Sequence, residues 1–230
     1  DVIHALAHVD WNKGEGKNRK LFHSTIFLFV STFLDFYVFS ASKYAIEGNM
    51  LNKDQAIFGA IFMPTSVINL VAGFVIRPYI TKLSLGWENR EFANFARVVG
   101  RLAAIIAGLT VLALGGAWFL GIPVLSMLYP KLGYALSASR LPLLLIILGG
   151  AFNAYINLFY YSLVIMQKRR HIFVIYALVA VMAVTISAPF VRWMGILGGA
   201  MSYLILMFTL MVCFGLTALW FFRKERKSAK

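Results

Sequence analysis

Residues 22–46 read FHSTIFLFVSTFLDFYVFSASKYAI, an apolar run with a single carboxylate, Asp35, near its centre. Short polar loops separate it from five more apolar runs, at about residues 55–80, 98–120, 141–166, 171–191 and 195–222. A helix rises ~1.5 Å per residue, so ~20 residues cross the ~30 Å hydrocarbon core of a bilayer. Because that core offers no water to unpaired backbone groups, runs of this length are expected to be helical. The sequence therefore predicts an all-α membrane protein with six transmembrane helices.

The composition agrees with a membrane location. Hydrophobic residues make up 60% of the 230 residues, and only 13% are charged, whereas soluble domains carry roughly 25% charged residues. Six spans leave no room for a large aqueous domain. The net charge of +13 therefore has no soluble domain on which a basic, aromatic nucleic-acid groove would form, and nucleic acid is not an expected partner.

Lysines and arginines alternate between the loops. All but five of the 22 fall in the leading segment, the loop regions after the second and fourth runs, and the C-terminal tail. The five exceptions are Lys43, Lys53, Lys131, Arg140 and Arg192. Because cytoplasmic loops are enriched in Lys and Arg, this distribution predicts that both ends of the chain are cytoplasmic. Basic clusters there are also expected to touch anionic membrane lipids.

The runs divide the chain into three parts: a cytoplasmic linker at 1–20, a six-helix lobe at 21–222 and a basic cytoplasmic tail at 223–230. The chain begins with Asp1 and shows no signal-peptide pattern. We therefore expect a piece of a longer protein, with the linker leading from a preceding lobe.

The first run carries a polar stripe. Ser24, Ser31, Asp35 and Ser42 are spaced by 7, 4 and 7 residues, so they share one helix face. An ionisable group near mid-bilayer costs about 2.5–3.5 kcal/mol on insertion scales, so Asp35 must face protein or water. It is either a cavity contact for a proton, cation or substrate, or one half of a structural pair. Lys43 lies nearer the external interface, where it either snorkels or binds substrate.

A second stripe lies on the second run, where Ser66, Asn69, Gly73 and Arg77 share one face. Pro64, within the same run, is expected to kink the helix. Arg77 is either an interfacial anchor or an inward-pointing cation for a phosphate, which guanidinium groups bind bidentately.

The fourth run carries a third stripe, made of Gly149, Asn153, Asn157 and Tyr160. These amides and the phenol either line a polar cavity or bond neighbouring helices together. With Asp35, Lys43, Asn69 and Arg77 they complete the set of candidate site residues.

Catalytic motifs are missing from the sequence. We find no HExxH, no CxxC and no Gly-rich phosphate loop, and the single cysteine, Cys213, excludes a disulfide within the chain. Asp35 is the one acidic residue deep in a run. We therefore expect binding rather than bond cleavage, without catalytic residues, cofactor or metal.

The order of several short motifs resembles a known family. The segment Ser42-Lys43-Tyr44-Ala45-Ile46 follows Asp35, and Met63-Pro64 and Arg77-Pro78 mark the second run. The segment 121–129 follows the third run, and 195–203 opens the last run. This succession, from about residue 21 to 222, resembles the C-terminal half of bacterial polysaccharide flippases. These proteins belong to the multidrug, oligosaccharidyl-lipid and polysaccharide exporter superfamily.

The resemblance implies a two-lobe transporter in the bacterial inner membrane, with this chain as its second lobe. It implies flipping of undecaprenyl-pyrophosphate-linked oligosaccharide repeat units by alternating access, for export of surface polysaccharide. Its implied partners are the lipid-linked oligosaccharide, an N-terminal six-helix lobe and polysaccharide polymerase machinery.

Three alternatives stay open, one of which is a purely structural role as a subunit of another membrane protein. A drug or cation antiporter of the same superfamily shares the fold, so fold alone does not decide between them. A membrane-embedded enzyme of glycan assembly would need a large external loop with catalytic groups, but the segment 121–140 is mostly apolar.

Overall fold

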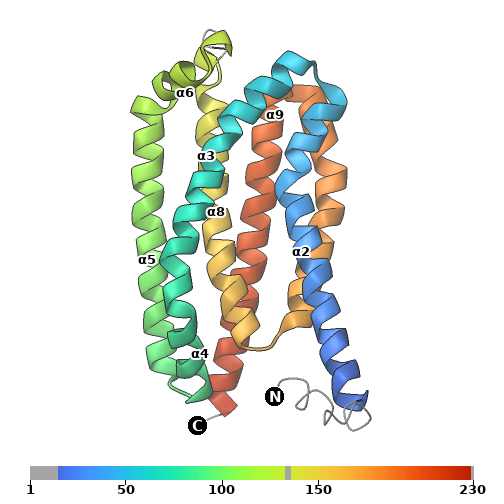
Figure 1. The fold of residues 1–230 in the computed structure, drawn as a ribbon, viewed down its shortest axis with the longest axis vertical. Helices are drawn as coiled ribbons and strands as arrows, with labels where there is room; N and C mark the ends of the chain where they lie inside the picture. Colours follow the sequence, from blue (N-terminus) through green and yellow to red (C-terminus); the bar gives the residue numbers. More distant parts are fainter. Residues whose placement is uncertain (1–14, 133–135, 229–230) are drawn as a thin grey trace, which may run out of the picture.

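The chain forms a helical bundle in this computed structural model, which describes residues 15–132 and 136–228 (Figure 1). Every regular element of the described residues is a helix. In chain order they are α2 (Glu15–Asn49), α3 (Asn52–Ile76), η2 (Arg77–Tyr79), α4 (Ile80–Glu88), α5 (Phe92–Gly116), η3 (Ala117–Gly121), α6 (Ile122–Leu128), η4 (Pro130–Leu132), α8 (Arg140–Ile165) and α9 (Arg169–Ser228). The all-α class predicted from the sequence is thus found.

Helices α3, α4 and α8 end just before a proline or a residue with positive φ. Pro78 follows the last turn of α3, and because proline lacks an N–H the chain continues there as the short 3₁₀ turn η2. Two non-glycine residues with positive φ, Arg90 and Gln167, follow the ends of α4 and α8. At each, the next amide bonds back to a carbonyl of the preceding helix, from Glu91 to Gly86 at 2.8 Å and from Lys168 to Leu163 at 3.0 Å. These turns send α5 and α9 back along the bundle.

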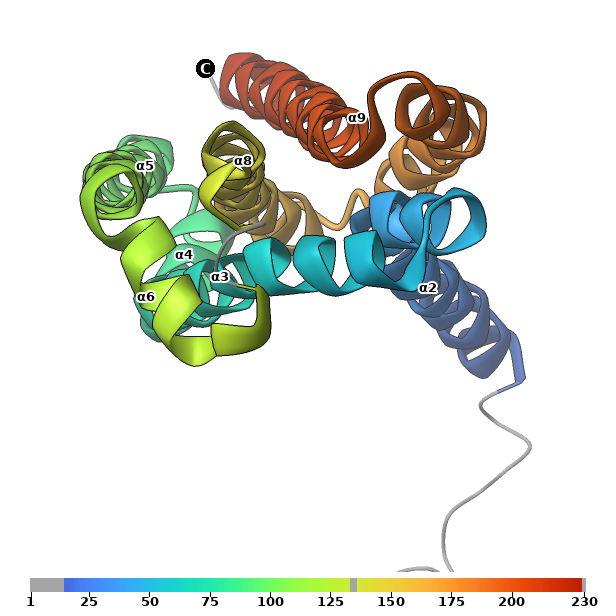
Figure 2. The same ribbon diagram turned by 90° about the horizontal axis from the view of Figure 1, so that it is seen from above.

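Helix α8 lies between α5 and α3 on one side and α9 on the other (Figure 2). Gly149, Gly150, Ala151 and Ala154 are buried on it, and such small residues let helices approach closely. The approach is closest at Gly149, where an added Cβ would lie 2.6 Å from the ring of the fully buried Tyr203. Small residues therefore place α8 in the middle of the bundle.

Helix α9 folds back on itself. Its 60 residues form two helical arms that meet at Gly195, whose φ of 59° and ψ of −133° are not helical. Figure 1 shows its two arms side by side and running in opposite directions. At the bend, Gly198 lies against the carbonyl of Phe190, and Arg192 donates a hydrogen bond from Nε to Asn49 Oδ1 at 2.7 Å. The arms match the runs 171–191 and 195–222.

The expected count of six separate transmembrane helices is wrong. Four helical segments of the described residues are long and apolar enough to cross a membrane: Asn52–Glu88, Phe92–Leu128, Arg140–Ile165 and Arg169–Lys227. The last holds the fifth and sixth predicted runs together. The first run lies in α2, which is not among the four. The protein thus has the helices of a multi-pass membrane protein, but fewer than predicted.

The basic segments gather at one end of the bundle. Helix α4, the α8–α9 junction and the C-terminal end of α9 lie together there, whereas α6 and the bend of α9 lie at the other end (Figure 1). A salt bridge between Lys168 and Glu225, 3.4 Å long, ties the junction to the end of α9. Of the predicted linker 1–20, residues 1–14 lie outside the described residues and the remainder belongs to α2. The predicted tail continues α9 as helix to Ser228.

Candidate functional site

A cavity of about 320 Å³ opens between α2, α3 and α8. We call it the polar cavity. Its lining combines one carboxylate, one guanidinium, three amides and a phenol with apolar neighbours: Asp35, Phe36, Phe39, Asn69, Gly73, Ile76, Arg77, Asn153, Asn157 and Tyr161. Residues of all three polar stripes therefore meet at one cavity, although the first stripe contributes Asp35 alone. Ser42 of that stripe is buried and bonded to Ser202 of α9 at 3.0 Å.

Two hydrogen bonds organise the amides. Asn153 Nδ2 donates to Asn69 Oδ1 at 2.8 Å, and Asn157 Nδ2 donates to the Asn153 carbonyl at 3.1 Å. Gly150 makes this possible, because an added Cβ there would lie only 3.3 Å from the Thr65 side chain and would press α8 away from α3. The amides therefore have both of the roles that the sequence left open: Asn153 and Asn69 join two helices, and all three amides line the cavity.

Asp35 connects the cavity to α9. Its carboxylate is half-buried and accepts a hydrogen bond from the hydroxyl of Tyr176, which is 3% exposed. Tyr176 lies on the first arm of α9. A carboxylate that both lines a cavity and is bonded to a neighbouring helix can respond to a proton or cation in the cavity and pass the change to that helix.

Arg77 lies at the end of α3, one turn beyond Gly73. Its Nε would be 3.7 Å from a Cβ added at Gly73, so the guanidinium lies back along α3 beside the glycine. The residue remains exposed while lining the cavity. A guanidinium in this position offers several donors to a phosphate or to sugar hydroxyls.

Two predicted site residues do not line the polar cavity. Lys43 lies over the ring of Phe62, with Nζ 4.2 Å from the ring centroid. Tyr160 packs edge-on against Tyr161, and it is Tyr161 that lines the cavity. Ser31, on the Asp35 stripe, is fully buried in the bundle. The stripes predict which face of a helix is polar, but they do not predict which neighbouring helix each side chain contacts along the length of that face.

Tyr176, Phe36 and Phe39 are functional candidates that the sequence reasoning missed. The two phenylalanines border Asp35 in the cavity wall. Tyr176 is the only tyrosine in the run 171–191, and a lone phenol in an apolar helix is a signal that it has a polar partner.

Chemically, the polar cavity is suited to binding oxygen-rich groups. Amide and guanidinium donors face hydroxyl, carbonyl or phosphate oxygens, and the single carboxylate provides an acceptor. Among the described residues, no group of three or more His, Cys, Asp or Glu side chains is arranged to hold a metal ion.

Comparisons with known protein families, with curated proteins and with solved structures give no match to this chain.

Proposed function

We propose that the chain is one lobe of a transporter that flips undecaprenyl-pyrophosphate-linked oligosaccharide repeat units across the bacterial inner membrane. The observation that carries the proposal is the convergence of Asp35, Asn69, Arg77, Asn153 and Asn157 on one cavity from three helices. Unpaired polar groups cost several kcal/mol in hydrocarbon, so a glycan headgroup needs such a lining in order to cross.

The roles of the residues follow from their chemistry. Arg77 binds a pyrophosphate oxygen, and the amides of Asn69, Asn153 and Asn157 bind sugar hydroxyls. Asp35 couples the cavity to α9 through Tyr176. Lys43, held over Phe62 two turns beyond Asp35, adds positive charge toward the other end of the bundle. Tyr160 supports Tyr161 in the wall.

In the membrane, the two arms of α9 cross separately. A straight helix of its 60 residues would be ~90 Å long, about three times the ~30 Å hydrocarbon core. The basic end of the bundle faces the cytoplasm, which sets the orientation. A second, N-terminal lobe closes the cavity, and rocking of one lobe against the other gives access from alternate sides.

The drug or cation antiporter is the second candidate, because the bonded Asp35–Tyr176 pair is suited to cation or proton exchange. The two candidates differ in their dependence on Arg77. An anionic pyrophosphate requires its charge, whereas a cationic drug does not.

The test is flipping of a fluorescent lipid-linked oligosaccharide by the intact protein in proteoliposomes. We expect Arg77→Ala to lower the initial rate about tenfold or more, the size of one charge-assisted contact, and Arg77→Lys to retain part of it. Arg101→Ala, an exposed arginine on α5 outside the polar cavity, serves as the control with an unchanged rate. Equal rates for Arg77→Ala and wild type would reject the proposed substrate.

A further inference from the structure

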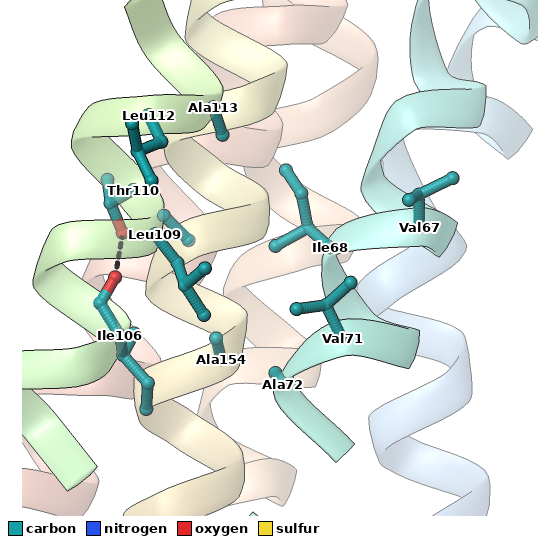
Figure 3. Close-up of a pocket in the computed structure, with 11 residues that line it drawn as sticks. Val67, Ile68, Val71, Ala72, Ile106, Leu109, Thr110, Leu112, Ala113 and Ala154 are labelled. Carbon is teal, nitrogen blue, oxygen red and sulfur yellow. Dashed lines mark hydrogen bonds between the residues drawn. The ribbon is translucent and has the colours of Figure 1, made fainter. Parts of the chain in front are cut away.

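A second hollow lies on the other side of the α3–α8 contact, between α3 and α5. Figure 3 shows its inner part, with Ile68 and Val71 of α3 facing Leu109 of α5 and with Ala154 of α8 behind them. This part has a volume of about 330 Å³. It joins a second part of about 570 Å³, because Val67, Ile68 and Ala113 line both. We call the whole the apolar slot.

The apolar slot is long and nearly free of polar groups. Along α5 and into η3 it extends from Ile106 to Leu120, about 21 Å at the rise of an α-helix. Its floor and one wall are made of small residues, among them Ala113, Gly116 and Ala154. Thr110 contributes a hydroxyl, but that group donates to the Ile106 carbonyl at 2.7 Å and so is already paired.

The surroundings of the apolar slot decide what can fill it. α3, α5 and α8 all belong to the segments long and apolar enough to cross a membrane, so the slot lies at the depth of the hydrocarbon. Water has no partners there, and an empty slot forfeits the dispersion contacts of its walls. A helix from another protein is ~10–12 Å wide with its side chains, whereas one flexible alkyl chain can follow a slot floored by alanines.

A positive charge stands at the outer end of the apolar slot. Arg140, the first residue of α8, lies over the ring of Trp118, with the guanidinium carbon 5.7 Å from the ring centroid. Leu143, one turn along α8 from Arg140, lines the slot. Ala117, the residue before Trp118 in the sequence, also lines it. A guanidinium at this rim matches the phosphate of a lipid whose chain enters the slot.

We propose that the apolar slot binds one acyl chain of an anionic phospholipid, whose phosphate is held by Arg140. The occupant is a resident lipid of the membrane and not the transported cargo, because the slot and the polar cavity lie on different faces of α3. Ile68 and Ala72 face the slot, whereas Asn69 and Gly73 face the cavity. The bound lipid fills the space between α3 and α5 and holds these helices at a fixed separation.

Two glycines of α5 give a matched pair of variants. Gly116 lines the apolar slot and Gly108 does not, and at both an added Cβ meets nothing within 4 Å. Gly116→Leu therefore fills the slot without a clash inside the protein, and Gly108→Leu adds the same side chain elsewhere on the helix.

The experiment supplies phosphatidylglycerol or phosphatidylcholine with identical chains to the full, delipidated protein in detergent, and measures bound lipid by native mass spectrometry. We expect one retained phosphatidylglycerol in wild type and Gly108→Leu, and a loss of about tenfold or more in Gly116→Leu. Arg140→Gln should weaken phosphatidylglycerol binding about tenfold. Phosphatidylcholine has the same phosphate, but its choline offsets the charge, so its binding should fall by less. Absence of retained phosphatidylglycerol in wild type, equal binding by Gly116→Leu, or equal loss in both glycine variants would overturn the proposal. Equal affinity of wild type for the two lipids would overturn the role of Arg140.

Discussion

At the scale of single residues, the bond between Asn153 and Asn69 is the contact that defines the polar cavity. It joins α8 to α3 at 2.8 Å while the cavity opens beside it. Bonds between membrane helices contribute ~0.6 kcal/mol on average and up to ~1.7 kcal/mol. We expect Asn153→Ala and Asn69→Ala each to lower the free energy of unfolding by an amount in this range, measured by reversible unfolding in mixed micelles.

The double variant tests whether the two amides act together. The effect of Asn69→Ala and Asn153→Ala combined should fall short of the sum of the single effects by ~0.6 kcal/mol, since either change alone breaks the bond. Strict additivity would mean that the two side chains do not interact in the membrane.

The residues of the polar cavity were predictable because they repeat with the period of a helix. Asn69, Gly73 and Arg77 share one face of α3, and Asn153 and Asn157 share one face of α8. Periodicity fixes a face only. It does not say that Lys43 meets Phe62 or that Tyr176 reaches Asp35. Those contacts depend on which helices pack together and at what level.

At the scale of elements, the bend of α9 depends on Gly195. Its φ of 59° with ψ of −133° lies in a region that residues with a Cβ rarely occupy. We expect Gly195→Ala to destabilise the protein by about 1–3 kcal/mol, measured as a fall in the thermal unfolding midpoint in detergent. Gly59→Ala is the control, because Gly59 is helical and has open space around it. Alanine there should be neutral or stabilising by up to ~1 kcal/mol, so equal losses in both variants would contradict the role assigned to the bend.

Hydrophobic runs predicted where helices exist better than how many separate helices there are. The break between the runs 171–191 and 195–222 falls at the bend of α9, as the sequence indicates. Run length alone does not reveal that the two arms join at a single residue, Gly195, without a loop between them. The passage from α5 to α6 is a second case in which the chain continues without a loop, through the π-helical turn η3. Pro123 does not break the chain there, since it stands in the first turn of α6, where proline is tolerated.

At the scale of the whole molecule, two hollows of opposite character share the α3–α8 pair. The polar cavity holds the charged and amide groups, and the apolar slot holds almost none. In a bilayer we expect the first to be wet, because a carboxylate and a guanidinium are costly to hold in a dry interior. The second has to be filled by hydrocarbon. The proposed transport therefore requires that water enters the polar cavity and does not enter the apolar slot.

Cysteine labelling measures this difference directly. In a Cys213→Ser background, Asn69→Cys and Asn157→Cys would be treated in membrane vesicles with a charged, membrane-impermeant methanethiosulfonate. Leu70→Cys is the matched control, since Leu70 is next to Asn69 and is 62% exposed on the surface of the bundle. We predict that the two cavity cysteines react and that Leu70→Cys, which we expect to face lipid, does not. Failure of both cavity cysteines to react, or equal reaction at Leu70→Cys, would contradict a water-filled cavity within the membrane.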